Sequence, residues 1–283
     1  MGLRINTNIP SLTAQRNLRG TRANLDKSLE RLSSGSRINR AGDDAAGLAI
    51  SESLRAQLRG LGQAERNAQD GVSLVQVAES AMAEISNILI RMRELGVQAA
   101  SDTIGKDERR FLDVEFQQLL EEIDRISNST EYNRVPLLNG KANAFEIQVG
   151  TRNNPAVDRI KLFDGNSADL NVVALGLNLT NVADKSSSQN SLATIDSALS
   201  SVTAIRAEFG AMQNRLQSII NNIMVSRENL SSANSRIRDA DIAEETAELT
   251  KNQILMQSGV SVLGQANSTI KSALNLLGQG GAG

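Results

Sequence analysis

The sequence predicts a mainly α-helical protein, an elongated antiparallel helical bundle or coiled coil formed by the N- and C-terminal segments, with a small central β-hairpin. Apolar residues recur every seven positions near both ends, which is typical of a helix that keeps one stripe against a partner helix. Aromatic residues make up only 2% of the chain. Buried surface must therefore come from aliphatic side chains, which pack well along helix seams.

The first predicted helix covers about residues 12–34. Its leucines stand seven residues apart, at Leu18, Leu25 and Leu32. Residues 33–43 (SSGSRINRAGD) interrupt this pattern with Gly and Ser and predict a bend.

Two further helices are expected at about 44–100 and 107–128, separated by a turn. Each carries one apolar stripe with alternating three- and four-residue steps, as an amphipathic helix requires. The clearest positions are Val75, Ala78, Met82, Ile85, Leu89 and Met92 in the longer helix, and Leu112, Phe116, Leu119, Ile123 and Ile126 in the shorter one.

The middle of the chain has a different character. Residues 144–149 and 159–163 alternate apolar and polar side chains, which predicts the two strands of a hairpin near 144–163. Residues 164–191 are rich in Asn, Ser, Asp and Gly, so we expect an exposed loop or a short irregular cap there.

Seven-residue repeats return in the last third of the chain in two series. The phase changes at residues 239–241, which predicts a joint between two helices rather than one continuous helix. The first series is Ile195, Val202, Phe209, Leu216, Ile223, Leu230 and Ile237; the second is Ile242, Leu249, Met256, Leu263, Ile270 and Leu277.

The charges of the two ends are opposite. Residues 4–40 hold eight Lys or Arg and two acids, a net charge of +6, whereas residues 239–283 hold two Lys and five acids, a net charge of −3. We expect the two ends to lie side by side and attract each other. A basic N-terminus would also suit a nucleic-acid arm, but aromatic residues are not interleaved with these cations, and no nucleic-acid or cofactor partner is predicted.

The composition argues against catalysis. The sequence has no Cys and no His, which removes thiolate nucleophiles, imidazole bases and the usual zinc ligands. Acidic clusters such as Glu244, Glu245 and Glu248 lack the His that a di-iron bundle needs, so they are expected to be solvated or ion-paired. No enzyme and no metal site are predicted.

The segment 252–270 has no charged residue, and its apolar side chains occupy more than one face of a helix. One partner helix cannot cover all of them, and exposed apolar surface of this kind marks a protein-binding face. Asn, Gln, Ser and Gly interrupt the segment, so membrane insertion is not expected. The opening MGLRINTNIP lacks the apolar region of a secretory signal peptide.

Several long segments resemble bacterial flagellins, the subunits of the flagellar filament. The resemblance covers both ends and most of the chain except about 164–195. It is carried by LRINTNIPSLTAQRNL (3–18), LDKSLERLSSGSRINRAGDDAAGLAISESLRAQLRGL (25–61), QDGVSLVQVAESAMAEISNILIRMRELGVQAA (69–100), EEIDRISNSTEYNRVPLLNG (121–140) and SSANSRIRDADIAEETAELTKNQILMQSGVSVLGQAN (231–267).

The resemblance implies a structural subunit that polymerises into a filament used for swimming, in a short form without large outer domains. It implies an inner terminal coiled coil from residues 1–42 and 239–283, and an outer helical bundle from residues 43–190 and 191–238. The self-assembly residues expected on this basis are Leu18, Leu25, Leu32, Leu249, Met256, Leu263, Ile270 and Leu277. A hook-filament junction protein, which shares the terminal helices, is the alternative.

Partners and location follow from the same resemblance. It implies copies of the chain itself, an export chaperone on the C-terminal region, hook-associated junction and cap proteins, and an extracellular filament reached by type III export without a cleaved signal peptide. The stretch RMRELGVQ (91–98) is similar to a motif read by a vertebrate Toll-like receptor, which would place Arg91, Leu95 and Glu115 in that contact.

Overall fold

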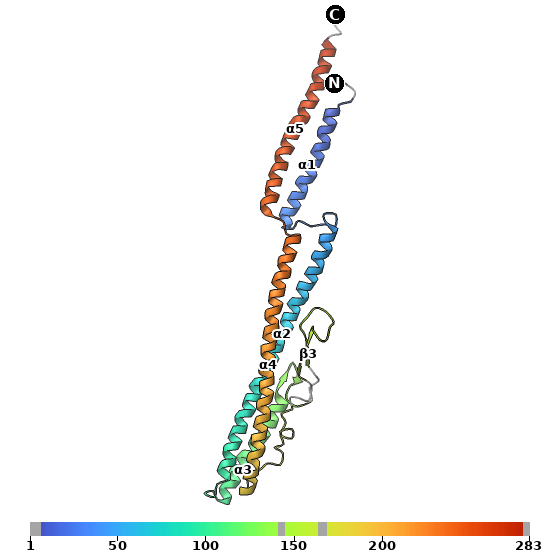
Figure 1. Ribbon diagram of the computed structural model, residues 1–283. Coiled ribbons are helices and arrows are strands. Elements are labelled where there is room, and N and C mark those ends of the chain that lie inside the picture. Colours follow the sequence, from blue (N-terminus) through green and yellow to red (C-terminus); the bar gives the residue numbers. More distant parts are fainter. Residues whose placement is uncertain (1–6, 141–144, 164–168, 280–283) are drawn as a thin grey trace. The chain divides into compact units, whose positions relative to one another are not determined.

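The computed structural model describes residues 7–140, 145–163 and 169–279 (Figure 1). Helices dominate both halves of the chain, and short strands lie between them. The elements in chain order are α1 (Ile9–Ser34), α2 (Ala45–Ala99), α3 (Lys106–Ser129), β1 (Glu131–Tyr132), β2 (Val135–Pro136), β3 (Phe145–Gln148), β4 (Arg159–Phe163), α4 (Lys185–Arg238) and α5 (Ile242–Gln279). The predicted fold class and all five predicted helices are confirmed.

Local chemistry sets the ends of the first helix. The side chain of Asn8 accepts a hydrogen bond from the backbone N–H of Ser11 at 3.0 Å, and Pro10 occupies the first turn, where its missing N–H costs nothing. At the other end Gly35 adopts a φ of 67°, a left-handed conformation that glycine takes without steric strain. The predicted bend therefore begins directly after Ser34.

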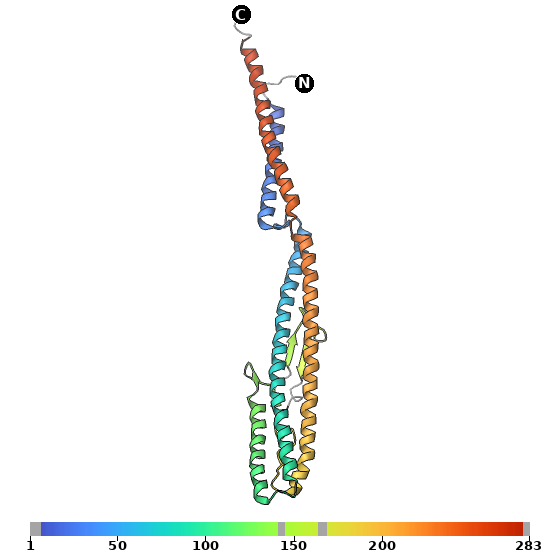
Figure 2. The same ribbon diagram turned by 90° about the vertical axis from the view of Figure 1, so that its left-hand side faces the viewer.

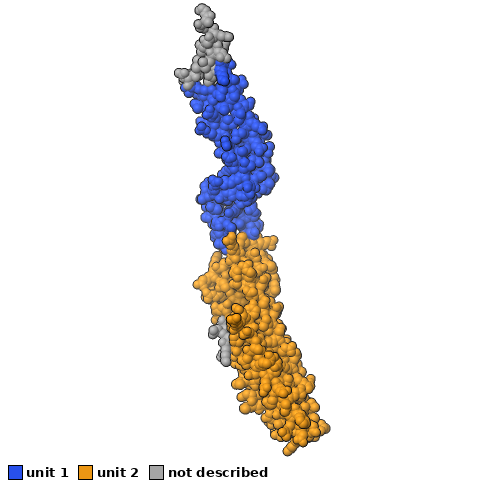
Figure 3. All heavy atoms as spheres, turned by 180° about the vertical axis from the view of Figure 1, so that it is seen from behind, with its two compact units in different colours: residues 1–56, 230–283 blue, residues 57–229 orange. Residues whose placement is uncertain are grey.

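The chain divides into two compact units, coloured separately in Figure 3. Unit 1 consists of residues 1–56 and 230–283, and unit 2 consists of residues 57–229. Unit 1 contains the paired helices α1 and α5. Unit 2 contains α3, all four strands and the greater parts of α2 and α4.

The core of unit 2 lies between α2, α3 and α4. The predicted stripe of α2 from Val75 to Met92 is buried, as are Phe116 and Ile123 on α3. Helix α4 buries Ile195, Val202, Phe209, Leu216 and Ile223, five members of its seven-residue series. The repeat thus holds these three helices together by continuous aliphatic contact.

The predicted central hairpin is confirmed as the antiparallel pair β3 and β4 (Figure 2), with Ile147 opposite Ile160. It packs on α2. The side chain of Asn67 donates a hydrogen bond to the carbonyl of Gln148 at 3.0 Å, and Ile147 occupies the space where a Cβ on Gly71 would lie. Gly71 therefore allows the strand to approach the helix closely.

For the segment 164–191, predicted as an exposed loop or a short irregular cap, the structure contradicts the exposed loop. Residues 164–168 lie outside the described part of the chain, and Leu170, Leu175, Leu177 and Val182 are buried in the core of unit 2 instead of forming an exposed loop. Helix α4 also begins earlier, at Lys185. The polar composition hid these single apolar residues, which do not follow a regular period but fill gaps between the helices.

A second hairpin was missed. Strands β1 and β2 pair across the two residues Asn133 and Arg134, whose φ angles are 51° and 65°. A two-residue hairpin turn is usually recognised in a sequence by Asn-Gly, because these residues tolerate positive φ at both positions. Arginine in the second position removed that signal.

Replacement of Phe116 by alanine should lower the free energy of unfolding of unit 2. The phenyl ring is fully buried between helices, and removing such a ring costs about 3–5 kcal/mol of transfer and cavity free energy. Urea unfolding followed by circular dichroism measures the change. Phe111→Ala on the same helix is the matched control, because Phe111 is 75% exposed, and its loss should change stability by less than about 0.5 kcal/mol. Equal losses for both variants would contradict the packing described here.

Candidate assembly surface on the terminal helices

Helices α1 and α5 lie side by side and antiparallel within unit 1 (Figure 1). Three contacts define their register. The side chain of Asn8 donates a hydrogen bond to the carbonyl of Ala266 at 3.2 Å, and the side chain of Leu18 fills the space next to Gly259. At the other end of α1, Arg31 pairs with Glu245.

Large side chains of one helix face small or polar ones of the other. Leu18 lies against Gly259, where a Cβ would come within 2.7 Å of a leucine methyl carbon. The same register places Leu25 opposite Asn252, and Asn252 is 2% exposed. The buried positions of α1 are likewise small: Ser11, Ala14 and Ser28. Each leucine knob therefore enters a shallow hole, which lets the two helix axes approach closely.

The predicted self-assembly residues lie mostly in this seam. Six of them are half-buried between the two helices: Leu18, Leu25, Leu32, Leu249, Met256 and Leu263. The side chains of Ile270 and Leu277 lie outside the described ones, although both residues belong to α5. The structure thus brings six of the eight together inside one chain.

A second apolar surface covers the outer sides of the pair. Its members belong to neither half of the seam and remain largely exposed, for example Ile254 at 57% and Val262 at 58%. The outer apolar surface, as it is called below, consists of Ile9, Leu12 and Leu29 of α1 and of Ile242, Ile254, Leu255, Val260 and Val262 of α5. The uncharged segment 252–270 had already indicated apolar residues on several faces of α5. Ile242 begins the second seven-residue series, yet it is exposed and belongs to the outer apolar surface.

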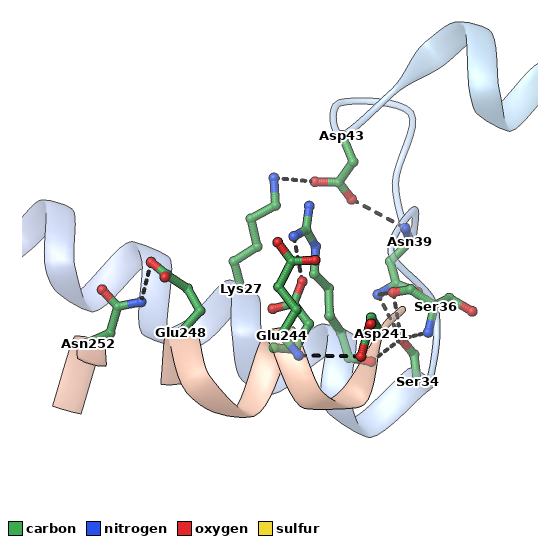
Figure 4. A network of polar contacts seen from close by, with 11 residues as sticks. Lys27, Ser34, Ser36, Asn39, Asp43, Asp241, Glu244, Glu248 and Asn252 are labelled. Atoms are coloured by element: carbon green, nitrogen blue, oxygen red, sulfur yellow. Dashed lines mark hydrogen bonds and ion pairs between the residues drawn. The ribbon is translucent and has the colours of Figure 1, made fainter. Parts of the chain in front are cut away.

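Backbone hydrogen bonds form a joint at one end of the α1–α5 pair, and Figure 4 shows neighbouring side-chain contacts, among them those of Asp43 with Lys27 and Asn39. Arg37 donates a backbone hydrogen bond to the carbonyl of Arg238 at 2.6 Å, and Ala240 donates one to the carbonyl of Gly35 at 3.0 Å. These two bonds join the α1–α2 bend to the α4–α5 bend, where Ser36 and Asp239 form an isolated antiparallel bridge. The predicted phase change at residues 239–241 is this joint.

The carboxylate of Asp43 stabilises the same region. The ammonium group of Lys27 lies 2.8 Å from Asp43, and the backbone N–H groups of Arg40 and Asn39 donate to its other oxygen. These contacts, that of Lys27 first, lower the pKa of Asp43 from 3.8 to about 2. Because the folded form binds the proton less tightly, this contribution to stability is complete above pH 3.8 and is lost as the pH falls through about 2.

The three residues expected at a receptor contact are divided between surface and core. Arg91 on α2 lies on the surface and pairs with Glu115 of α3 at 2.9 Å and with Glu94 at 3.0 Å. These partners raise the pKa of Arg91, and the hydrogen bond that Arg91 donates to Glu115 has the largest effect. Leu95 is fully buried in the core of unit 2. The surface feature at this place is therefore an ion pair that joins α2 to α3.

Within the part of the chain that the structure describes, no three acidic side chains gather as a metal site would require. Across the same residues, none of the helices has a stretch long and apolar enough to cross a bilayer.

Comparison with known proteins identifies the family. A model of the bacterial flagellin N-terminal helical region matches residues 5–143, and a model of the C-terminal helical region matches residues 192–277. A flagellin of Halalkalibacterium halodurans is 44% identical over 96% of this chain and 99% of its own length. A flagellin of Bacillus subtilis is 42% identical over 97% of this chain and all of its own.

Solved structures agree. The crystal structure of Bacillus cereus flagellin is 33% identical, with a TM-score of 0.50 over 60% of this chain and 94% of that one. A flagellar hook-associated protein described from Vibrio parahaemolyticus has a TM-score of 0.57 over 70% of this chain and all of its own, but at 13% identity it shows the fold alone. Family models, near full-length relatives and helical architecture lead to one conclusion: the chain belongs to the bacterial flagellins and is a structural subunit of the flagellar filament.

Proposed function

We propose that copies of this subunit stack through the outer apolar surface of α1 and α5, and that the filament so formed is extracellular and serves swimming. The observation that carries the proposal is the exposure of large aliphatic side chains on both flanks of a seam that is already closed. Each part of that surface contacts a different part of the outer apolar surface on a neighbouring copy. A contact between unlike patches of identical chains does not close on itself and generates a helical polymer.

Magnitudes favour a polymer over a dimer. Complete burial of a Val, Leu or Ile contributes about 1.5–3 kcal/mol, and about half of each side chain of the outer apolar surface is still exposed. Each therefore offers about 1 kcal/mol, whereas fixing two molecules together costs about 4–15 kcal/mol. One neighbour that covers a few of these side chains contributes less than this cost. Several neighbours add their contributions while the subunit loses its freedom of motion only once, so assembly is cooperative.

We further propose that residues 1–42 and 239–283 form the inner layer of the filament and residues 43–190 and 191–238 the outer layer. The two interruptions of the helices support this division, since α1 ends at Ser34 and α5 begins at Ile242. The two interruptions lie far apart in the sequence but are hydrogen-bonded to each other at the joint. The proposed inner and outer layers therefore separate at a single point in space.

Export partners follow from the same surface. Apolar side chains that wait for neighbours need cover before assembly, and we propose a chaperone that binds the C-terminal region at about 239–283. Passage through the flagellar type III apparatus without cleavage of a signal peptide, and contacts with hook-associated junction and cap proteins at the filament ends, complete the proposal.

The proposed contact with a vertebrate Toll-like receptor is narrower than the sequence motif. In the described packing Arg91 and Glu115 are available to a partner, and both already engage each other at 2.9 Å. Leu95 is buried, so it contributes to this patch only indirectly, as part of the core that holds α2 in place. A receptor that binds this patch would therefore meet a rigid ion pair.

Removal of residues 264–283 should abolish filaments and leave unit 2 folded. The truncation deletes the distal part of α5, including Ala266, whose carbonyl accepts a hydrogen bond from Asn8, and so removes the partner that holds the start of α1 and its exposed Ile9 and Leu12 in place. The core of unit 2 contains none of the deleted residues. Electron microscopy of the concentrated protein checks assembly, and circular dichroism with urea unfolding checks the fold. Intact filaments from the truncated chain would refute the proposal.

Replacement of Val262 by lysine should raise the critical concentration for assembly about tenfold or more. The side chain is 58% exposed in the single chain, and an unpaired ammonium group at a desolvated contact costs at least about 1–3 kcal/mol. Val262→Ile keeps the surface apolar and is the matched control, expected to assemble like the unmodified protein. Sedimentation of polymer across a concentration series gives both values, and equal critical concentrations for the lysine and isoleucine variants would exclude Val262 from the contact.

A further inference from the structure

One charged pair interrupts the apolar seam between α1 and α5. The guanidinium group of Arg31 lies 2.7 Å from the carboxylate of Glu245, and the two side chains are 26% and 11% exposed. Among the described residues of unit 1, Glu245 is the one charged residue that is buried. The ε nitrogen of Arg31 is buried without a hydrogen-bond partner. Separating the pair would therefore leave two poorly solvated charges.

The pair stands at the base of both helices. Arg31 lies in the last turn of α1 and Glu245 in the first turn of α5. A cation near a helix C-terminus and an anion near a helix N-terminus each interact favourably with the helix dipole. Antiparallel packing brings exactly these two ends together only when the helices are in the observed register.

We propose that the Arg31–Glu245 ion pair selects the α1 of the same chain as the partner of α5 and fixes their register. This inference rests on the proposed assembly through the outer apolar surface. It answers a question that the assembly raises, because α5 offers apolar side chains on several flanks and every neighbouring copy presents an α1 with the same leucines. Apolar contact alone does not fix one register, whereas a buried charge pair penalises a wrong one. Every copy also carries Arg31, so the pair selects the α1 of the same chain only together with the joint that holds the two helix ends next to each other.

The joint gives the pairing within one chain its advantage. Backbone hydrogen bonds hold residues 35–37 beside residues 238–240, and Arg31 and Glu245 lie about one helical turn beyond them on either side. The local concentration of one for the other is then in the millimolar range or above. A shift of α5 by one seven-residue repeat would move it about 10.5 Å. Leucines would still face small residues, but Arg31 and Glu245 would be too far apart to form their ion pair.

A charge exchange tests the pair. Arg31→Glu and Glu245→Arg should each raise the critical concentration for filament assembly about tenfold or more, since each leaves like charges in a buried seam. The double variant with both substitutions restores an opposite pair and should assemble clearly better than either single variant, although not fully like the unmodified protein, because both exchanged charges now oppose the helix dipoles. Arg40→Glu is the matched control: its pair with Glu30 is exposed, Arg40 by 76%, and assembly should change less than about threefold.

Mixing the two single variants tells pairing within a chain from pairing between chains. If Arg31 pairs with Glu245 of its own chain, an equimolar mixture should assemble as poorly as either variant alone. Assembly of the mixture at the level of the unmodified protein would overturn the inference, and so would a double variant that assembles no better than the single ones. Failure of the unmodified protein to form filaments would instead sink the proposed function.

A cross-link measures the register directly and does not depend on the charge exchange. The chain contains no Cys, so Leu18→Cys with Gly259→Cys introduces a single reporter pair, and the leucine that would crowd a side chain at 259 is removed at the same time. In filaments this pair should close within one chain. Adding Arg31→Met and Glu245→Leu, which keeps the seam apolar, should lower the intrachain disulfide and raise the fraction of linked dimers on a non-reducing gel. An unchanged intrachain yield would overturn the inference.

Discussion

The structure of unit 1 depends on the close antiparallel approach of α1 and α5. That approach is possible because leucine on one helix meets glycine, serine, alanine or asparagine on the other. The contact of Leu18 with Gly259 shows the limit, since a single Cβ would come within 2.7 Å of a leucine methyl carbon. Small seam residues have a second effect. A seam that accepts one row of large side chains from each helix leaves the remaining large side chains outside, and these form the outer apolar surface.

The seam holds α1 and α5 together, and the outer apolar surface remains exposed for contacts with other molecules. The same side chains could not do both. A helix pair that buried all of its aliphatic side chains would be more stable as a single molecule and would have no reason to polymerise. Unit 2 illustrates the contrast, because its helices bury their repeats in a three-helix core that includes Phe116 and Met82. Unit 2 therefore has a buried core of its own, whereas unit 1 keeps large apolar side chains exposed.

The regular parts of the fold were predictable because they follow a period. The stripe from Val75 to Met92 and the series from Ile195 to Ile223 are buried as expected, and the change of phase at residues 239–241 is a real interruption. The features that were missed lack a period: Leu177 and Val182 fill gaps from an irregular segment, and the turn at Asn133 and Arg134 lacks its usual glycine. At the candidate site the repeats identified the seam, whereas Val260 and Val262 belong to no seven-residue series and were indicated by the uncharged segment 252–270, whose apolar residues occupy more than one face of the helix.

Leu95 and Glu245 show why burial has to be known before a role is assigned. Sequence spacing places Leu95 about one turn from Arg91. Four residues turn a helix by about 400°, which is about 40° more than a full turn, and this offset is enough to place Arg91 on the surface and Leu95 in the core. Glu245 belongs to an acidic cluster that was expected to be solvated or ion-paired. Its neighbour Glu244 is exposed, yet Glu245 lies in the seam against Arg31. Neighbouring glutamates of one cluster thus have different surroundings: Glu245 lies on the face of α5 that forms the seam, and Glu244 lies on an exposed face.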